Sequence, residues 1–337
     1  MEFRTLVELP KKELTISYSD QILLLGSCFA ENIGNLLVKN KFNCEVNPFG
    51  VLYNPLSIAN ALQCLDDKKT FTEKDLFEYK GLYHSFMHHG SFSASSAGEC
   101  LNNINNRMQL AAAQFPKLNY LLITFGTAYV YEYKQTGMVV ANCHKLPDSA
   151  FTRRLLSIEQ IVDTYVSLIT DLLKKNAEVR ILFSVSPIRH VKDGMHRNQL
   201  SKATLLLAID QLKETFPGNV FYFPSYELVM DELRDYRFYA DDMLHPSSVA
   251  VNYLWEAFDN CYFSRETRQI MKEWGQISKA LQHKPFHPES EHYKSFLIQI
   301  VLKINQLKEK CPFLDVEKEL ELCRINYLAI IMRKTHW

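Results

Sequence analysis

The sequence of 337 residues lacks the features that mark several special classes of protein. Its formal net charge is zero, so bulk electrostatics indicate no nucleic-acid partner. No apolar run approaches the roughly 18 residues needed to cross a bilayer, so we expect no membrane partner either. The N-terminal residues lack the apolar segment of a secretory signal, and the eight cysteines include no Cys-x-x-Cys pair. We therefore expect a reduced, cytoplasmic protein.

Glycine and proline are also scarce, at 11 and 12 residues, and no internal repeat or low-complexity tract interrupts the chain. A long flexible linker is therefore not expected. Apolar residues make up 47% of the sequence, which is enough for a packed core. We expect one large α/β domain over residues 1–264 and a charged, helical C-terminal extension over residues 265–337.

Short apolar runs bounded by turn signals are typical of buried strands, and they occur at 22–26, 44–46, 119–126, 179–185 and 219–223. Amphipathic helical patterns lie between most of these runs. One of them, residues 157–175, begins with a capping box formed by Ser157 and Gln160. Nearly continuous apolar strands that alternate with amphipathic helices indicate a parallel sheet covered on both faces.

Three segments depart from this alternation. Residues 55–116 are predicted to be a mostly helical or irregular insertion. Residues 128–142 alternate apolar and polar side chains around a Gln-Thr-Gly turn, which predicts a β-hairpin after the third main strand. Residues 315–333 are predicted to form a helix of the extension, whose helices either pack on the core or bind a partner, including a second copy of the chain.

The stretch QILLLGSCFAENIGN, residues 21–35, places two small nucleophiles between a predicted strand and a predicted helix. Ligands of open α/β sheets bind beyond the carboxyl ends of the strands, which is where Ser27 and Cys28 lie. The N-terminus of the following helix is expected to lower the pKa of the Cys28 thiol and to stabilise an oxyanion. In the alternative interpretation Ser27 only caps the helix and Cys28 is a small packing residue.

A second stretch, RFYADDMLHP, carries Asp242 and His245 three residues apart, just before a helix predicted to begin near Ser247. This spacing lets one carboxylate orient the neighbouring imidazole and fix its tautomer. Asp241 stands at the wrong spacing for this role. The alternative is that the pair only caps the start of the helix.

These stretches resemble the GSCFA family, a branch of the SGNH/GDSL hydrolase superfamily. The motif Gly-Ser-Cys-Phe-Ala is intact at residues 26–30. Further stretches that resemble the family are NPFGVLYNP (47–55), HSFMHHG (84–90), ANCHKLP (141–147), SVSPIRH (184–190) and RDYRFYADDMLHP (234–246). The resemblance covers about residues 1–260. It implies a three-layer α/β/α sandwich with about five parallel strands in flavodoxin-like order, and ester or acyl-transfer chemistry without a cofactor.

When the glycine of the superfamily's first motif is aligned with Gly26, Cys28 aligns with the superfamily's nucleophile. Ser27 is the alternative nucleophile. The same comparison implies that His245 is the general base and acid and that Asp242 orients it. The resemblance therefore implies an acyl esterase or acyltransferase that forms a covalent acyl-enzyme. The family supplies no substrate. We expect an acetyl or other short acyl group on a small metabolite or glycan, and the expected cytoplasmic location favours acyl-coenzyme A or a small acylated metabolite.

The oxyanion hole departs from the superfamily. The block Gly-x-Asn-Asp is replaced by Gly126-Thr127-Ala128-Tyr129, so the side-chain amide donor is missing. Loss of one such donor costs about 10²–10³ in rate. The backbone N–H groups of Cys28 and Gly50 remain as donors. Other residues expected at the oxyanion hole or the substrate are Asn47, Gly126, Asn142, His144, Arg189 and His88.

Two hypotheses of other classes stay open. The histidines of HSFMHHG, together with His144 and His190, suit a metal-dependent hydrolase, although no His-Glu-x-x-His spacing is present and the pair Asp242–His245 would be left unexplained. The third hypothesis is a non-catalytic binding module on a degenerate hydrolase fold, which the missing amide favours. A trapped acyl intermediate would discriminate between these hypotheses.

Overall fold

The computed structural model describes residues 4–11, 13–283 and 285–334, and the chain forms two compact units. The first unit consists of the segments ending at Lys11 and Asn35 and of Cys44–Phe258. The second consists of the segments ending at Asp20 and Asn43 and of the chain from Asp259 onward. The division therefore differs from a single boundary after residue 264, because two N-terminal segments belong to the second unit.

The first unit is built on a five-stranded parallel sheet, as predicted. Its strands are β1 (Ile22–Gly26), β2 (Cys44–Val46), β5 (Tyr120–Phe125), β9 (Arg180–Val185) and β10 (Val220–Tyr222). They lie in the order β10-β9-β5-β1-β2, and each neighbouring pair is parallel. Read from the other edge, the order is the second, first, third, fourth and fifth strand of the sheet, which is the flavodoxin-like order.

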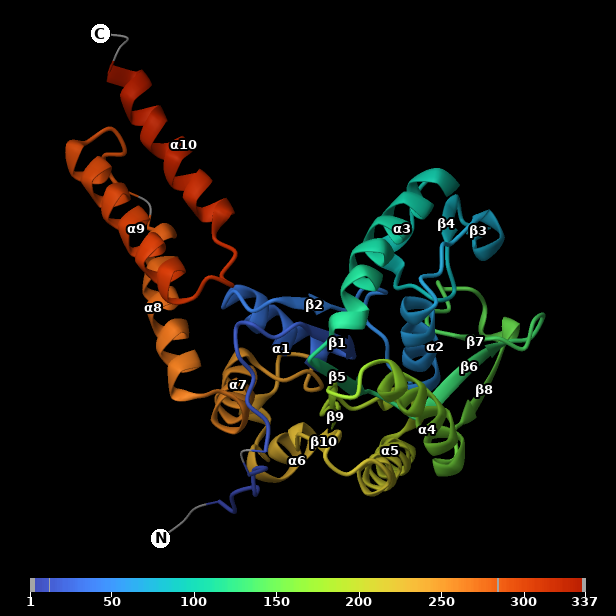
Figure 1. The fold of residues 1–337 in the computed structure, drawn as a ribbon. Helices are drawn as coiled ribbons and strands as arrows, with labels where there is room; N and C mark the ends of the chain where they lie inside the picture. Colours follow the sequence, from blue (N-terminus) through green and yellow to red (C-terminus); the bar gives the residue numbers. More distant parts are fainter. Residues whose placement is uncertain (1–3, 12, 284, 335–337) are drawn as a thin grey trace. The chain divides into compact units, whose positions relative to one another are not determined.

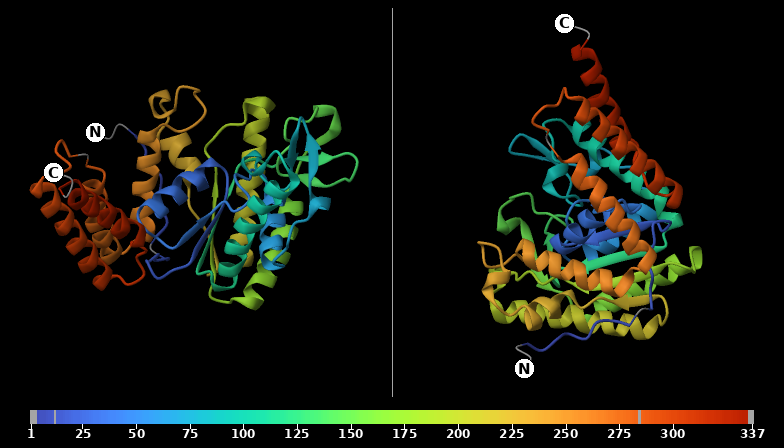
Figure 2. Two further views of the ribbon diagram at one scale, coloured as in Figure 1. Left: turned by 90° about the horizontal axis from the view of Figure 1, so that it is seen from above. Right: turned by 90° about the vertical axis from the view of Figure 1, so that its left-hand side faces the viewer.

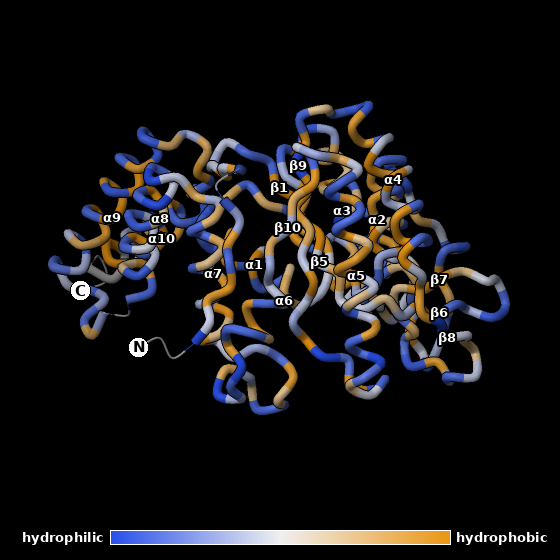
Figure 3. Tube along the Cα trace, turned by 90° about the horizontal axis from the view of Figure 1, so that it is seen from below, coloured by the Kyte–Doolittle hydropathy of each residue, from blue (hydrophilic) through white to orange (hydrophobic). Residues whose placement is uncertain are grey.

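Helices cover both faces of this sheet (Figures 1 and 2). One face carries Leu23, Leu121 and Ile181, which share a buried core with helices α2 (Pro55–Asp66), α3 (Ala97–Gln114), α4 (Ile158–Lys175) and α5 (Met195–Thr215). The alternate residues Leu24, Leu122 and Leu182 lie on the other face, with side chains of α1 (Cys28–Lys39) and α7 (Ser248–Tyr262). The strands are strongly hydrophobic (Figure 3), as expected for a sheet buried on both faces. The unit is a three-layer α/β/α sandwich.

Two small antiparallel sheets accompany the central one. The insertion contains a hairpin of β3 (Phe77–Tyr79) and β4 (Leu82–His84), which the sequence did not predict. The predicted hairpin after the third main strand is present as β6 (Tyr129–Tyr133) and β7 (Val139–Val140), and β8 (Phe151–Leu155) extends it. The predicted capping box begins α4, where Ser157 Oγ accepts a hydrogen bond from the Gln160 N–H.

The chain between β10 and α7 contains only short turns, which are α6 (Ser225–Glu227), a π-helical turn (Leu228–Glu232) and a 3₁₀ turn (Tyr236–Phe238). The residues that follow the last turn form the loop that carries Asp242 and His245.

The second unit is helical, with α8 (Arg265–Leu281), α9 (Glu291–Lys310) and α10 (Glu317–Lys334). Helix α9 packs against both α8 and α10. The indole N–H of the buried Trp274 donates to the carbonyl oxygen of Lys39 at 2.9 Å, which joins α8 to the last residue of α1. Within the described residues, no helix combines the length and the apolar character needed to cross a membrane.

Candidate active site

The turn between β1 and α1 requires glycine at residue 26. Gly26 has φ +147°, and a Cβ at this position would lie 2.3 Å from the carbonyl oxygen of Thr124 on β5. The same oxygen accepts the N–H of Ser27 at 3.3 Å, so the backbone after β1 lies in close contact with β5. Helix α1 then begins at Cys28. The Cys28 side chain is thereby placed at the carboxyl edge of the parallel sheet, where ligands of such sheets bind.

The two candidate nucleophiles differ in accessibility. Ser27 is only 1% exposed, and its Oγ is buried without a hydrogen-bond partner. The Ser27 hydroxyl therefore does not cap α1, although its carbonyl oxygen accepts the Glu31 N–H at 3.2 Å. Cys28 is partly exposed and carries a free thiol. A substrate can reach Cys28, whereas Ser27 would first have to be uncovered.

The pKa of the Cys28 thiol is raised above its usual value, so the expected lowering by the helix N-terminus is wrong. Burial is the largest cause, and the carboxylate of Glu31 adds to it. Hydrogen bonds from the hydroxyl of Tyr53 and from the Cys28 N–H lower the pKa by less. Since the thiol stays protonated at neutral pH, nucleophilic attack by Cys28 needs a base.

Asp242 and His245 make the contact that their spacing predicts. His245 Nδ1 and Asp242 Oδ2 are 2.5 Å apart, and Asp242 Oδ1 accepts the backbone N–H groups of Leu244 and His245, each at 2.9 Å. The His245 N–H and then its imidazole are the main causes that lower the pKa of Asp242 to about 2. The start of α7 is capped instead by Ser247, whose Oγ accepts the Ala250 N–H at 3.3 Å. The pair therefore orients an imidazole and does not cap the helix.

Arg189 ties the His245 loop to the sheet. It follows β9, and its guanidinium donates to the carbonyl oxygen of Met243 in that loop and lies 4.8 Å from the ring centroid of Tyr239. The carboxyl ends of the parallel strands β1 and β9 lie at the same edge of the sheet. Arg189, after β9, therefore holds the loop at the edge where Cys28 follows β1. Among the described residues no hydrogen bond joins His245 to Cys28, and no partner occupies His245 Nε2.

The backbone donors expected for an oxyanion hole are largely in use. The Gly50 N–H donates to the Asn47 carbonyl oxygen at 2.7 Å, so the expectation that Gly50 is a free donor is corrected. The N–H groups of Gly126 and Thr127 both donate to the Tyr53 carbonyl oxygen, at 2.7 and 2.9 Å. The Cys28 N–H, at the first position of α1, remains as a backbone donor of this edge.

Asn47 supports the turn at Gly26. Its Oδ1 accepts the Gly26 N–H at 2.9 Å, and its own N–H donates to the Leu24 carbonyl oxygen at 2.9 Å. Its Nδ2 is buried without a partner. Asn47 therefore lies at the predicted site, where it fixes the end of β1.

His88 of the insertion and His144, which follows β7, are packing residues. His88 is fully buried, stacks on Phe49 with ring centroids 4.7 Å apart, and pairs through Nδ1 with Ser85 Oγ at 3.0 Å. His144 Nε2 pairs with the Ser85 carbonyl oxygen at 2.8 Å, and Asn142 Oδ1 accepts the His144 N–H. Burial lowers the pKa of His88 to about 3 and that of His144 to about 4. In the part of the chain that the structure describes, no three His, Cys, Asp or Glu side chains could jointly hold a metal ion.

Lys202 of α5 is a site residue that sequence reasoning missed. It is 1% exposed, and its Nζ donates to the carbonyl oxygens of Gly126 and Ser186, each at 2.6 Å. Burial lowers its pKa to about 7. Lys202 precedes the buried Leu205 and Leu212 by three and ten residues, so it lies on the apolar face of its helix. The sequence signal that could have identified Lys202 is a lysine among the apolar residues of this helix face.

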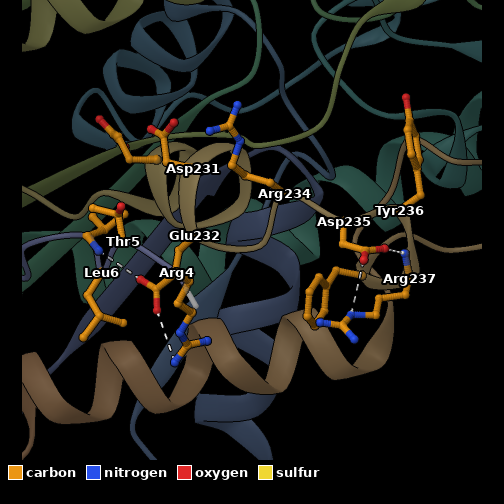
Figure 4. Close-up of a pocket in the computed structure, with 12 residues that line it drawn as sticks. Arg4, Thr5, Leu6, Asp231, Glu232, Arg234, Asp235, Tyr236 and Arg237 are labelled. Atoms are coloured by element: carbon orange, nitrogen blue, oxygen red, sulfur yellow. Dashed lines mark hydrogen bonds and ion pairs between the residues drawn. The ribbon is translucent and has the colours of Figure 1, made fainter. Parts of the chain in front are cut away.

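A separate open cavity of about 1150 Å³ lies between residues 4–7 and residues 227–238 (Figure 4). Glu232 accepts the Val7 N–H at 3.1 Å and pairs with Arg4 at 3.6 Å across this cavity. The lining carries charges of both signs and none of the predicted site residues. It therefore indicates no particular ligand class.

Comparison with known proteins agrees with the resemblance found in the sequence. The model of the GSCFA family matches residues 21–258, and that of the GSCFA domain protein, C-terminal domain, matches residues 274–327. No curated protein matches this sequence.

Proposed function

Because the chain belongs to the GSCFA family, whose model spans the whole candidate site, we propose that it transfers a short acyl group through a covalent acyl-enzyme at Cys28. The chemistry is that of an SGNH-type esterase or acyltransferase. One observation carries the proposal: the oriented pair Asp242–His245 is tied by Arg189 to the sheet edge at which the Cys28 thiol is accessible.

In the proposed reaction Cys28 Sγ attacks the carbonyl carbon of an ester or thioester, and His245 Nε2 takes the thiol proton. The carbonyl π electrons move to oxygen, which the Cys28 N–H at the start of α1 stabilises. Collapse of this adduct expels the leaving group, which receives the proton from His245. Water or an alcohol then attacks the thioester with the same base, and the thiolate leaves.

The electrostatics of the site support the need for His245. A thiol whose pKa is raised by burial and by Glu31 is a poor nucleophile until a base removes its proton. Asp242 Oδ2 holds Nδ1 of the imidazole, which leaves Nε2 to accept that proton. The ionised Asp242 also stabilises the imidazolium once it has formed.

The substrate proposed is an acetyl or other short acyl group on a small metabolite or glycan, with acyl-coenzyme A as a donor. The flavodoxin-like strand order and the late Asp-x-x-His motif support the SGNH assignment. Ser27 remains the second candidate nucleophile, and its burial argues against it.

Intact-protein mass spectrometry after mixing with p-nitrophenyl acetate or acetyl-coenzyme A tests the proposal. The wild type is expected to gain one acetyl group, and Cys28→Ala is expected to lose that gain. Ser27→Ala serves as the matched neighbour and should retain it. An adduct lost only in Ser27→Ala would move the nucleophile by one residue. A folded wild type that forms no adduct with any acyl donor would instead favour a non-catalytic binding module.

A further inference from the structure

Tyr53 lies close to Cys28: its hydroxyl lowers the pKa of the Cys28 thiol, and the N–H of the preceding Leu52 donates to the Gly26 carbonyl oxygen at 3.0 Å. Its ring meets His190 edge to face, with centroids 5.9 Å apart and an interplanar angle of 84°. The next residue, Asn54, caps α2 by accepting the Ser57 N–H at 2.8 Å. The backbone and the ring of Tyr53 are therefore both anchored, with the hydroxyl close enough to Cys28 to act on the pKa of its thiol.

Tyr53 also lies against the end of β5. Its carbonyl oxygen accepts the N–H groups of Gly126 and Thr127, the first two residues after that strand. A Cβ on Gly126 would lie 3.0 Å from the Tyr53 carbonyl oxygen and 3.3 Å from its Cδ1. The lack of a side chain at Gly126 therefore leaves room for Tyr53 beside the block in which this sequence lacks the side-chain amide, because residue 128 is alanine.

We propose that the Tyr53 hydroxyl is the side-chain donor that binds the oxyanion formed when Cys28 is acylated, an inference that rests on the function proposed above. As the Sγ–C bond forms, the carbonyl π electrons move to oxygen and the thiol proton passes to His245 Nε2. The oxyanion and Sγ are then bonded to the same carbon, so a hydroxyl that lies close to Sγ also lies close to the oxyanion. When the C=O bond re-forms and the leaving group departs with the proton from His245, Tyr53 keeps its own proton.

The environment of Tyr53 suits a donor. Burial, followed by the neighbouring Cys28, raises the pKa of the Tyr53 hydroxyl to about 12, so the hydroxyl stays protonated at neutral pH. Asn47 is the competing side chain at this edge. Its Oδ1 accepts the Gly26 N–H and its Nδ2 is buried without a partner, so Asn47 supports the turn, whereas Tyr53 is partly exposed.

The test compares Tyr53→Phe with wild type and with Tyr133→Phe, a control on β6 whose ring is also partly exposed. Single-turnover acylation is measured with p-nitrophenyl acetate and with its thiono analogue, in which the carbonyl oxygen is sulfur. Sulfur accepts hydrogen bonds poorly, so a side chain that donates a hydrogen bond to the oxyanion accelerates the oxygen ester more than its thiono analogue. Tyr53→Phe is expected to lower the acylation rate constant about 10²–10³-fold at unchanged KM, and to reduce the preference for oxygen over sulfur.

Each outcome decides the matter. A slower oxygen ester and an unchanged thiono ester in Tyr53→Phe, with wild-type behaviour in Tyr133→Phe, support the assignment. Equal losses for both esters would mean that Tyr53 acts only on the thiol or on the local structure, which overturns it. Wild-type acylation in Tyr53→Phe overturns it while the proposed function stands. If the wild type forms no acyl-enzyme, both proposals fall.

Discussion

Lys202 Nζ donates a hydrogen bond to the carbonyl oxygen of Gly126 at 2.6 Å from a side chain that is 1% exposed. The N–H of the same Gly126 donates to the Tyr53 carbonyl oxygen, and the Tyr53 hydroxyl lowers the pKa of the Cys28 thiol. A buried lysine on α5 is thus linked to the candidate nucleophile through one glycine and one tyrosine. A neutral amine keeps two N–H donors, which is enough for the two carbonyl oxygens that Lys202 serves.

We predict that Lys202→Met destabilises the fold, because it leaves two buried carbonyl oxygens without donors, at roughly 1–3 kcal/mol each. The native pKa of Lys202 is about 7, below its unfolded value of about 10.4, so the native state binds fewer protons between these values. The stability that Lys202 contributes therefore rises with pH, by roughly 2 kcal/mol from pH 7 to pH 9. Urea unfolding of both proteins at the two pH values measures the difference.

The matched control is Lys213→Met on the same helix, whose side chain is 42% exposed. It should differ from wild type by the same small amount at both pH values. If the Lys202→Met and wild-type stabilities change in parallel from pH 7 to pH 9, the lowered pKa is not a property of the folded protein.

His245→Ala should lower the rate of the proposed acyl transfer by about 10²–10⁴-fold, because the proposed base for Cys28 is lost. Its fold should be unchanged, since about half of the His245 side chain is exposed. Asp242→Asn should cost roughly 10²-fold or more through loss of tautomer control. His196→Ala, an exposed histidine on α5, is the control. Steady-state kinetics with circular dichroism measures each effect, and full activity in His245→Ala would remove the mechanism.

Glu31→Gln should lower the pKa of the Cys28 thiol, because the Glu31 carboxylate is one of the two causes that raise it. At pH 8, below the native pKa, a lower pKa means more thiolate and therefore faster alkylation by iodoacetamide. The rate of alkylation is expected to rise severalfold, and peptide mass spectrometry of the peptide that contains Cys28 measures this rate. Glu178→Gln, with a side chain 86% exposed, should leave the rate unchanged. Slower alkylation in Glu31→Gln would contradict this electrostatic account.

Gly26→Ala should destabilise the protein by roughly 2–4 kcal/mol, since the new Cβ would lie 2.3 Å from a backbone oxygen at a φ that alanine avoids. Gly98→Ala is the matched control within α3, where no atom lies within 4 Å of the new Cβ. That variant should be neutral or more stable by up to about 1 kcal/mol. Thermal unfolding of both variants decides, and equal stabilities would show that the turn relaxes.

Arg189→Ala should lower the acylation rate about 10- to 100-fold, because the His245 loop loses its tether to the sheet edge. Hydrogen exchange of the amides of residues 240–247 should become faster in this variant. Arg237→Ala removes an arginine beside the same loop, which pairs with Asp235 at 3.7 Å, and should change neither quantity. Unchanged exchange in Arg189→Ala would mean that other contacts hold the loop.

The central fold follows from local sequence patterns. The five apolar runs match the five strands to within a residue at each end, because each run is bounded by turn-forming residues. Strand β8, Phe-Thr-Arg-Arg-Leu, was missed because its polar side chains give no apolar run. Hairpin β3–β4 has three-residue strands, too short for a periodic signal.

The candidate site was only partly predictable, for a similar reason. The contact between Asp242 and His245 is local, so their spacing was informative. The contacts of Gly126 with Tyr53 and Lys202 could not be predicted, because they join segments that are distant in the chain and meet only in the folded sheet. The raised pKa of Cys28 depends on burial, which no motif records.

The imidazole and its orienting carboxylate belong to one tetrapeptide, and Asp242 also binds the backbone of that tetrapeptide. Any displacement of the loop therefore moves the imidazole, its tautomer-fixing carboxylate and its ring orientation together. In the proposed mechanism, the distance from this loop to the Cys28 thiol is then the geometric variable that a movement of the loop changes. Arg189 donates to the Met243 carbonyl oxygen, between the two side chains, so it restrains this distance.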